Sequence, residues 1–262
     1  MKIDFPTKYI VKYPIENKKY YYGKNKEEME EVLLTASKNF CMYCGKRLEI
    51  DGDKILQLEH SVDKDGNYNQ RSKKTLLLHC KYNLAVSCVK CNEVYKKRIE
   101  KIDFNNYKDV NCPDDCCEMC NTYKKMRNEY ISKNAIILQP QGITKYGKQY
   151  KIRYNLLKHI LEPDDENYEE EAIFLIANHI DRFHLNGDRF STCIIDICAD
   201  IFFLYKIGVK DFNSLIKEIE QKRFSNILGV LFVKFLKENF EEKSIEGLIE
   251  FCKLLILLDS VV

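Results

Sequence analysis

The sequence predicts an α+β protein: a small mixed unit in its first part and an α-helical C-terminal half. Two CxxC pairs bracket short apolar runs of strand length between residues 41 and 91, and after residue 155 apolar residues recur at helical spacing. The charge also changes sign along the chain: residues 1–160 contain 31 Lys and Arg against 20 Asp and Glu, a net +11, whereas residues 161–262 contain 11 against 20, a net −9. We therefore expect a basic domain over 1–160 and an acidic helical domain over 161–262.

The composition indicates a folded globular protein. Of 262 residues, 45% are hydrophobic and 31% charged, with 10 Gly and 5 Pro, which excludes collagen-like and largely disordered chains. The N-terminus has no apolar run of signal-peptide length, and no uncharged apolar run reaches ~18 residues, so we expect a cytoplasmic protein without a membrane span. In that compartment the 12 cysteines favour metal binding over disulfides.

The elements of the basic half follow from local patterns. Residues 26–39 predict a helix, since acidic residues fill its first turns and suit the positive end of the helix dipole. After a turn at 51–53, residues 54–59 predict a strand, and the polar stretch 61–74 predicts a loop. Residues 91–102 predict a second helix.

The acidic half reads as helices throughout. Its apolar residues recur three and four positions apart, and Asp or Ser stands at several of the predicted N-termini, where their side chains cap helices well. The predicted helices are 166–184, 188–208, 211–221, 224–239 and 244–258.

The strongest chemical signal is the two CxxC pairs, Cys41/Cys44 and Cys88/Cys91. Two thiolates at this spacing can hold one side of a tetrahedral zinc ion, and a second pair completes the site. Either pair alone could instead be a redox motif, but two pairs flanking strand- and helix-like segments favour structural zinc.

Other polar residues between and beside these pairs could carry catalysis, because zinc held by four cysteines is closed to substrate. Glu59 and Asn92 offer hard oxygen ligands that suit Mg²⁺ or Mn²⁺. His60, next to Glu59, could take a proton from an attacking water. Asn83 lies just before the next apolar run.

The pattern CxYC…LEH…NLAVSCxxCN over the motif core 41–97 resembles the HNH (ββα-metal) endonuclease family in its four-cysteine zinc form. The resemblance implies that His60 is the general base and that Asn83 orients the His60 loop. It also implies that Glu59, where the family more often has Asp, and Asn92 bind the catalytic Mg²⁺ or Mn²⁺. The implied activity is metal-dependent hydrolysis of DNA phosphodiester bonds; the alternative is a zinc-stabilised adaptor that binds nucleic acid without cleaving it.

Two further groups accompany the motif. Basic residues on or beside the predicted helix fit a phosphate-rich substrate, and these are Lys90, Lys96, Lys97, Arg98 and Lys101. A second cysteine cluster could form another zinc site or consist of ordinary reduced thiols; its members are Cys112, Cys116, Cys117 and Cys120, with Cys80 as a further candidate ligand.

Beyond the motif the layout loosely resembles the HNH nuclease subunit of Septu-type anti-phage defence systems, which also occurs with some retrons. That resemblance implies a helical C-terminal half and a partner ABC-type ATPase that controls the nuclease. A restriction or mobile-element HNH nuclease is the alternative. We expect residues 161–262 to bind such an ATPase or to mediate self-association, the alternative being a scaffold that completes the fold.

Overall fold

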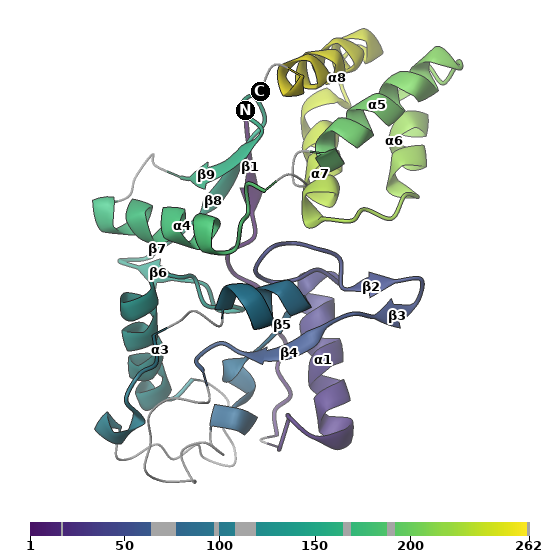
Figure 1. Cartoon of the computed structure of the whole chain (residues 1–262). Coiled ribbons are helices and arrows are strands. Elements are labelled where there is room, and N and C mark those ends of the chain that lie inside the picture. Colours follow the sequence, from purple (N-terminus) through teal and green to yellow (C-terminus); the bar gives the residue numbers. More distant parts are fainter. Residues whose placement is uncertain are drawn as a thin grey trace.

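The computed structural model describes residues 1–16, 18–63, 77–96, 100–107, 119–164, 169–187 and 192–260. Helices and strands alternate irregularly in the first part, and helices alone follow residue 169 in the described chain. The α+β class predicted from the sequence is confirmed. Figure 1 shows the helices of residues 192–259 gathered at the upper right, a small sheet and the helix of residues 170–182 to their left, and the other elements below.

A three-stranded antiparallel sheet joins the two ends of the basic half. Strand β8 (Ile152–Asn155) lies between β1 (Lys2–Phe5) and β9 (Ile160–Pro163). Its register pairs Lys2 with Asn155 on one side and Ile152 with Pro163 on the other. The predicted domain boundary between residues 160 and 161 therefore falls inside β9.

A second antiparallel pair carries the residues of the candidate site. Strand β4 (Gln57–His60) pairs with β5 (Leu84–Ser87), with Gln57 opposite Ser87 and His60 opposite Leu84. Helix α1 (Gly23–Ser37) packs against β5. The short pair β2 (Glu49–Ile50) and β3 (Asp53–Lys54) precedes β4, so the strand predicted over 54–59 is divided between β3 and β4.

The remaining elements of the basic half are short apart from one helix. They are the 3₁₀ turns η1 (Lys81–Asn83) and η4 (Phe104–Asn106), the π-helical segment η2 (Lys90–Tyr95), helix α3 (Asn121–Asn134), and the hairpin of β6 (Thr144–Lys145) and β7 (Lys148–Gln149). The helix predicted over 91–102 is thus a six-residue π-helical segment in the described chain.

All five predicted helices of the C-terminal half are present. They are α4 (Glu170–Arg182), α5 (Thr192–Lys206), α6 (Phe212–Glu220), α7 (Ile227–Phe240) and α8 (Ile245–Asp259). The side chains of Asp211, Asn226 and Ser244 cap α6, α7 and α8, respectively. Helix α5 packs against α6, α7 and α8, whereas α4 packs on β9 and α7 on β1.

Candidate metal centre and adjoining histidine site

Four cysteines from two distant segments meet in one buried cluster. The sulfur atoms of Cys41, Cys44, Cys88 and Cys91 all lie within 4.8 Å of one another, and those of Cys44 and Cys88 are 3.8 Å apart. A tetrahedral zinc ion with Zn–S bonds of about 2.3 Å holds its sulfurs about 3.8 Å apart. No disulfide joins the described cysteines. The cluster could therefore bind a metal ion such as zinc.

Backbone hydrogen bonds shape the turns that carry these thiols. In the first turn Gly45 N donates to Cys41 O (2.8 Å) and Cys41 N donates to Lys46 O (2.7 Å). In the second, Asn92 N donates to Cys88 O (3.1 Å). Met42 N donates to Val86 O (3.1 Å), which ties the first turn to β5 and so aligns the two pairs.

The thiols of the cluster influence one another's pKa values, and a bound cation would stabilise their thiolate forms. Hydrogen bonds from the other three cysteines lower the pKa of the Cys88 thiol. The same contacts raise the pKa of Cys44 and of Cys91, because neither can ionise easily beside a thiolate. Four thiolates in one buried space need a metal ion to balance their charge, and metal binding would release the remaining protons. The donor set thus fits zinc.

The start of α7 presses on the first cysteine turn from the C-terminal half. Ile227 N donates to Gly45 O (2.8 Å), and Asn226 Nδ2 donates to Cys44 O (3.1 Å). Gly45 has φ 69°, and a Cβ there would come within 2.6 Å of Ile227 Cγ2. Only glycine suits both the left-handed backbone and this close approach.

His60 ends β4 with a fixed tautomer. Its Nε2 lies 3.1 Å from the carbonyl oxygen of Leu78, which can only accept a hydrogen bond, so Nε2 carries the proton. The basic lone pair is then on Nδ1. The ring packs against Tyr21, with centroids 4.6 Å apart, and the residue is only 8% exposed.

Asn83 ties down the chain that follows His60. Its Oδ1 accepts from Val62 N (2.8 Å) and from the Tyr123 hydroxyl (2.8 Å). Its Nδ2 donates to Val62 O (3.0 Å) and Leu77 O (3.2 Å). The fully buried amide therefore fixes both polar groups of the Val62 backbone, two residues beyond His60.

The predicted divalent-metal ligands do not form an open site. The Glu59 side chain is 0% exposed, and its two oxygens accept hydrogen bonds from the Tyr43 hydroxyl and the Lys96 ammonium. Asn92 is half-buried, and its Nδ2 donates to Gln57 Oε1 (2.7 Å). A carboxylate with both oxygens occupied and an ammonium against it does not fit Mg²⁺ or Mn²⁺, which need an accessible oxygen and room for waters.

The other predicted residues are dispersed. Lys90 and Lys101 are exposed, but Lys96 is buried in the pair with Glu59 rather than facing a nucleic acid. Cys120 is half-buried, and its sulfur accepts a hydrogen bond from Tyr123 N at the start of α3. Five predicted site residues lie outside the described residues: Cys112, Cys116, Cys117, Lys97 and Arg98.

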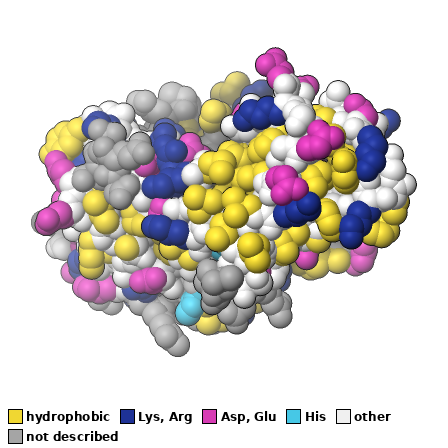
Figure 2. Space-filling view, turned by 90° about the horizontal axis from the view of Figure 1, so that it is seen from above, with side chains coloured by type: hydrophobic (Ala, Val, Ile, Leu, Met, Phe, Trp, Pro, Cys, Tyr) yellow, Lys and Arg dark blue, Asp and Glu magenta, His cyan; other side chains and the backbone are white. Residues whose placement is uncertain are grey.

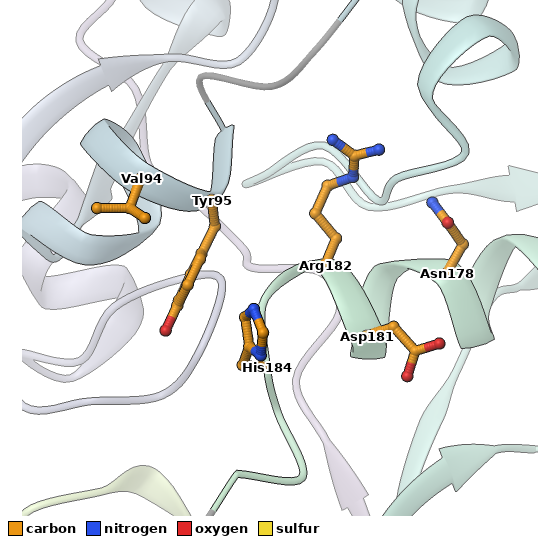
Figure 3. A pocket seen from close by; sticks show the side chains of 6 residues that line it. All are labelled: Val94, Tyr95, Asn178, Asp181, Arg182 and His184. Atoms are coloured by element: carbon orange, nitrogen blue, oxygen red, sulfur yellow. The ribbon is translucent and has the colours of Figure 1, made fainter.

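Sequence reasoning missed two features near the site. Tyr43 and Lys96 hold Glu59, and only the fold brings residues 43, 59 and 96 together. A pocket of about 380 Å³ also opens beside η2; Figure 3 shows Val94 and Tyr95 facing the end of α4 across it, with Asn178, Asp181, Arg182 and His184 on the other wall. Nothing in the sequence pairs η2 with α4.

Comparisons of the chain with protein-family models, with curated proteins and with solved structures found no match. Among the described residues, no helix combines the length and the apolar character needed to cross a membrane.

Proposed function

We propose that this protein is an endonuclease of the HNH type that cleaves phosphodiester bonds in DNA, with His60 as the general base. The observation that carries the proposal is the imidazole at the end of β4, whose Nε2–H donates to Leu78 O (3.1 Å). In this tautomer Nδ1 is the ring nitrogen that would take a proton from water.

The surroundings of His60 support the same role. Asn83 fixes the Val62 backbone through hydrogen bonds of 2.8 and 3.0 Å, so the chain on the C-terminal side of the base is held in place. The four-cysteine cluster joins the turn before β4 to the end of β5. A general base works best when its position is set before substrate arrives, and this arrangement sets it.

The charge of the basic half supports a polyanionic substrate. Residues 1–160 carry a net +11; exposed Lys90 begins η2, and Lys101 is exposed as well. Such residues attract phosphates without reading sequence. Because Glu59 and Asn92 do not fit a divalent cation in this arrangement, we derive no step through one.

A histidine substitution tests the proposal. We expect His60→Ala to lower DNA cleavage by about 10²–10⁴-fold, the contribution of a positioned general base. The assay uses plasmid DNA and single-stranded DNA and RNA oligonucleotides, each with and without added Mg²⁺ or Mn²⁺. Exposed His184 provides the matched control, and His184→Ala should cleave as the wild type does. Zinc content and circular dichroism establish that both variants fold.

Two results of this assay would contradict the proposal. If the wild type cleaves none of these substrates, or if His60→Ala cleaves as fast as His184→Ala, then His60 is not the base. Binding of DNA without cleavage would instead favour the zinc-stabilised adaptor.

We further propose that the helical half binds a regulatory partner, an ABC-type ATPase of the kind the Septu-type resemblance implies. Helices α5 and α8 pack side by side, and both carry exposed apolar side chains, namely Phe203 on α5 and Leu254 and Leu257 on α8; exposed Ile207 follows α5 directly. Figure 2 shows hydrophobic side chains gathered on the face seen from above. Apolar surface of this kind is typical of protein interfaces.

Introducing negative charge at apolar positions of α5 and α8 tests the partner proposal in the full chain. Phe203→Glu combined with Leu257→Glu should prevent co-purification with the ATPase expressed together with it, while zinc content stays unchanged. Sedimentation of the protein alone separates self-association from binding of a different protein. Unchanged co-purification would contradict the proposal and favour the alternative, in which the helical half is a scaffold that completes the fold.

A further inference from the structure

The Glu59 carboxylate already has a cation. The side chains of Glu59 and Lys96 are 0% and 7% exposed, and the ammonium donates to one carboxylate oxygen while the Tyr43 hydroxyl donates to the other. A buried carboxylate is stable in its charged form only when it is paired and hydrogen-bonded in this way. Each oxygen is thus engaged, and the negative charge is balanced by the chain itself.

The π-helical backbone of η2 delivers Lys96 to this position. The backbone N–H of Lys96 donates to the carbonyl oxygen of Cys91, five residues earlier, which is the wide hydrogen-bonding pattern of a π-helix. Lys96 follows directly after this segment, and its ammonium also donates to the backbone carbonyl of His60. One end of Lys96 is therefore tied to the cysteine cluster and the other to the end of β4.

We infer that the Lys96 ammonium is the resident cation of this site and takes the place of the divalent metal that the HNH resemblance implies at Glu59. A Mg²⁺ or Mn²⁺ ion on Glu59 would need an oxygen that now accepts from Lys96 or Tyr43. It would also lie within a few ångströms of the ammonium, where like charges repel strongly in a buried environment.

Within the described chain, the Asn92 side chain is engaged only through its amide nitrogen, so the inference rests on Glu59. Its amide donates to Gln57 Oε1, and Gln57 Nε2 in turn donates to Glu93. The amide of the second predicted ligand is thus part of a side-chain network along η2 and β4. The inference rests on the proposed function only in treating Glu59 and Asn92 as the expected metal ligands; the occupancy of Glu59 by Lys96 is independent of catalysis.

Binding of Mn²⁺, followed by electron paramagnetic resonance on the zinc-loaded full-length protein, tests the inference. Wild type and Glu59→Gln should bind Mn²⁺ equally weakly, because neither presents a free carboxylate at this site. Lys96→Met should gain one site at least about tenfold tighter, the lower end of what outer-shell partners contribute to metal affinity. The double variant Lys96→Met/Glu59→Gln should lose that gain.

Two results would overturn the inference. One is a wild-type Mn²⁺ site that Glu59→Gln abolishes, which would place the metal on Glu59 with Lys96 present. The other is a folded Lys96→Met protein that gains no site. If the methionine variant does not fold, Lys96→Gln provides a second test, because glutamine keeps a donor toward Glu59 without the charge. The comparison of wild type with Glu59→Gln is independent of both variants, because Lys96 is present in each protein. Loss of cleavage in His60→Ala concerns the proposed function alone, so the two can fail separately.

Discussion

Asn83 shows how much one buried amide contributes at the candidate site. It makes four hydrogen bonds, two of them to the N–H and C=O of Val62, and it is fully buried. Each such bond contributes about 1 kcal/mol, and the backbone groups left without a partner lose about 1–3 kcal/mol each. The position of the chain after His60 therefore depends on this side chain, which holds both polar groups of the Val62 backbone.

Replacing Asn83 should weaken both stability and cleavage. We expect Asn83→Ala to lower the free energy of unfolding by about 3–5 kcal/mol, because several buried backbone groups lose their partner at once. Chemical denaturation in the presence of zinc measures the loss. Asn239→Ala is the control, since the Asn239 amide is exposed and donates to a helix carbonyl at 2.8 Å. Equal loss in the two variants would show that Asn83 does not hold the His60 segment.

The buried side chain of His179 should make the stability of the protein depend on pH. Burial, aided by the nearby Arg182 charge, lowers the pKa of His179 to about 3, and its Nδ1 accepts from Ile137 N (3.1 Å). In the unfolded chain a histidine has a pKa of about 6.5, so between these values the unfolded state binds the proton and the folded state does not. The stabilisation is full above about pH 6.5 and is lost as the pH falls toward 3.

The measurement is the free energy of unfolding from pH 7.5 down to pH 4.5 with excess zinc. Wild type should lose up to about 1.4 kcal/mol per pH unit from this residue, whereas His179→Gln, which keeps an acceptor and cannot titrate, should lose that much less. Taking the difference between the two proteins removes the shared effect of acid on the cysteine cluster. Parallel pH curves would contradict the assignment of His179 as a buried neutral histidine.

At the scale of elements, the sequence predicts those that depend on local signals. The helices α4 to α8 have apolar spacing along their whole length, and Asp211 and Ser244 mark two N-termini that the structure confirms. The π-helical η2 could not be predicted, since Tyr95, Ile99 and Ile102 recur at helical spacing in the sequence and favour an α-helix over 91–102. Its wide turn follows from the fold around it.

The features of the candidate site also divide into those that local sequence signals predict and those that depend on the fold. The pairing of Cys41/Cys44 with Cys88/Cys91 follows from ligand spacing, which is local to each pair. The Tyr43–Glu59–Lys96 network depends on how β4, the first cysteine turn and η2 meet, and no spacing rule reports that. Sequence therefore identifies the candidate residues of the metal centre but not the partners of Glu59.

The cysteine turns should act as one metal-dependent element. We expect Cys44→Ser or Cys88→Ser to lose bound zinc and to destabilise the β4–β5 region severely, because structural zinc supplies about 10–16 kcal/mol of apparent binding free energy. Elemental analysis of carefully purified protein measures the metal. Cys252→Ser is the control: this buried cysteine lies on α8, and its sulfur contacts Cys198 of α5. Wild-type protein that folds without metal would contradict the prediction.

For the whole molecule, the change of charge sign at residue 160 does not mark two separate bodies. Lys145 pairs with Glu171 (3.0 Å), Arg153 with Asp164 (3.0 Å) and Lys2 with Glu162 (3.1 Å), so acidic residues after 160 neutralise basic ones before it. Composition gives the sign of each half but not where the charges meet. Part of the +11 is therefore matched within the chain rather than left for a polyanion.

A hydrogen-bonded link between the halves runs from the first cysteine turn to the start of α7. Arg47 N donates to Ser225 O (2.8 Å), Arg47 Nε donates to Phe224 O (2.6 Å), and Ile227 N donates to Gly45 O (2.8 Å). Asn226 lies at the centre of these contacts, with its Oδ1 capping α7 and its Nδ2 donating to Cys44 O. These hydrogen bonds tie the start of α7 to Cys44 and to its neighbour Gly45.

This link predicts that a cap in the helical half affects metal retention. Asn226→Ala removes the cap of α7 and the bond to Cys44 O, and should lower the free energy of unfolding by about 2–3 kcal/mol. Zinc should also pass faster to a competing chelator, because the first cysteine turn loses one of its restraints. Ser244→Ala is the matched control: it removes the cap of α8, where Gly247 N donates to the Ser244 hydroxyl (3.2 Å), and should lower stability by about 1 kcal/mol without changing zinc release. Stopped-flow transfer of zinc to a coloured chelator compares the two variants, and equal rates would mean that the cysteine turn holds its metal independently of the helical half.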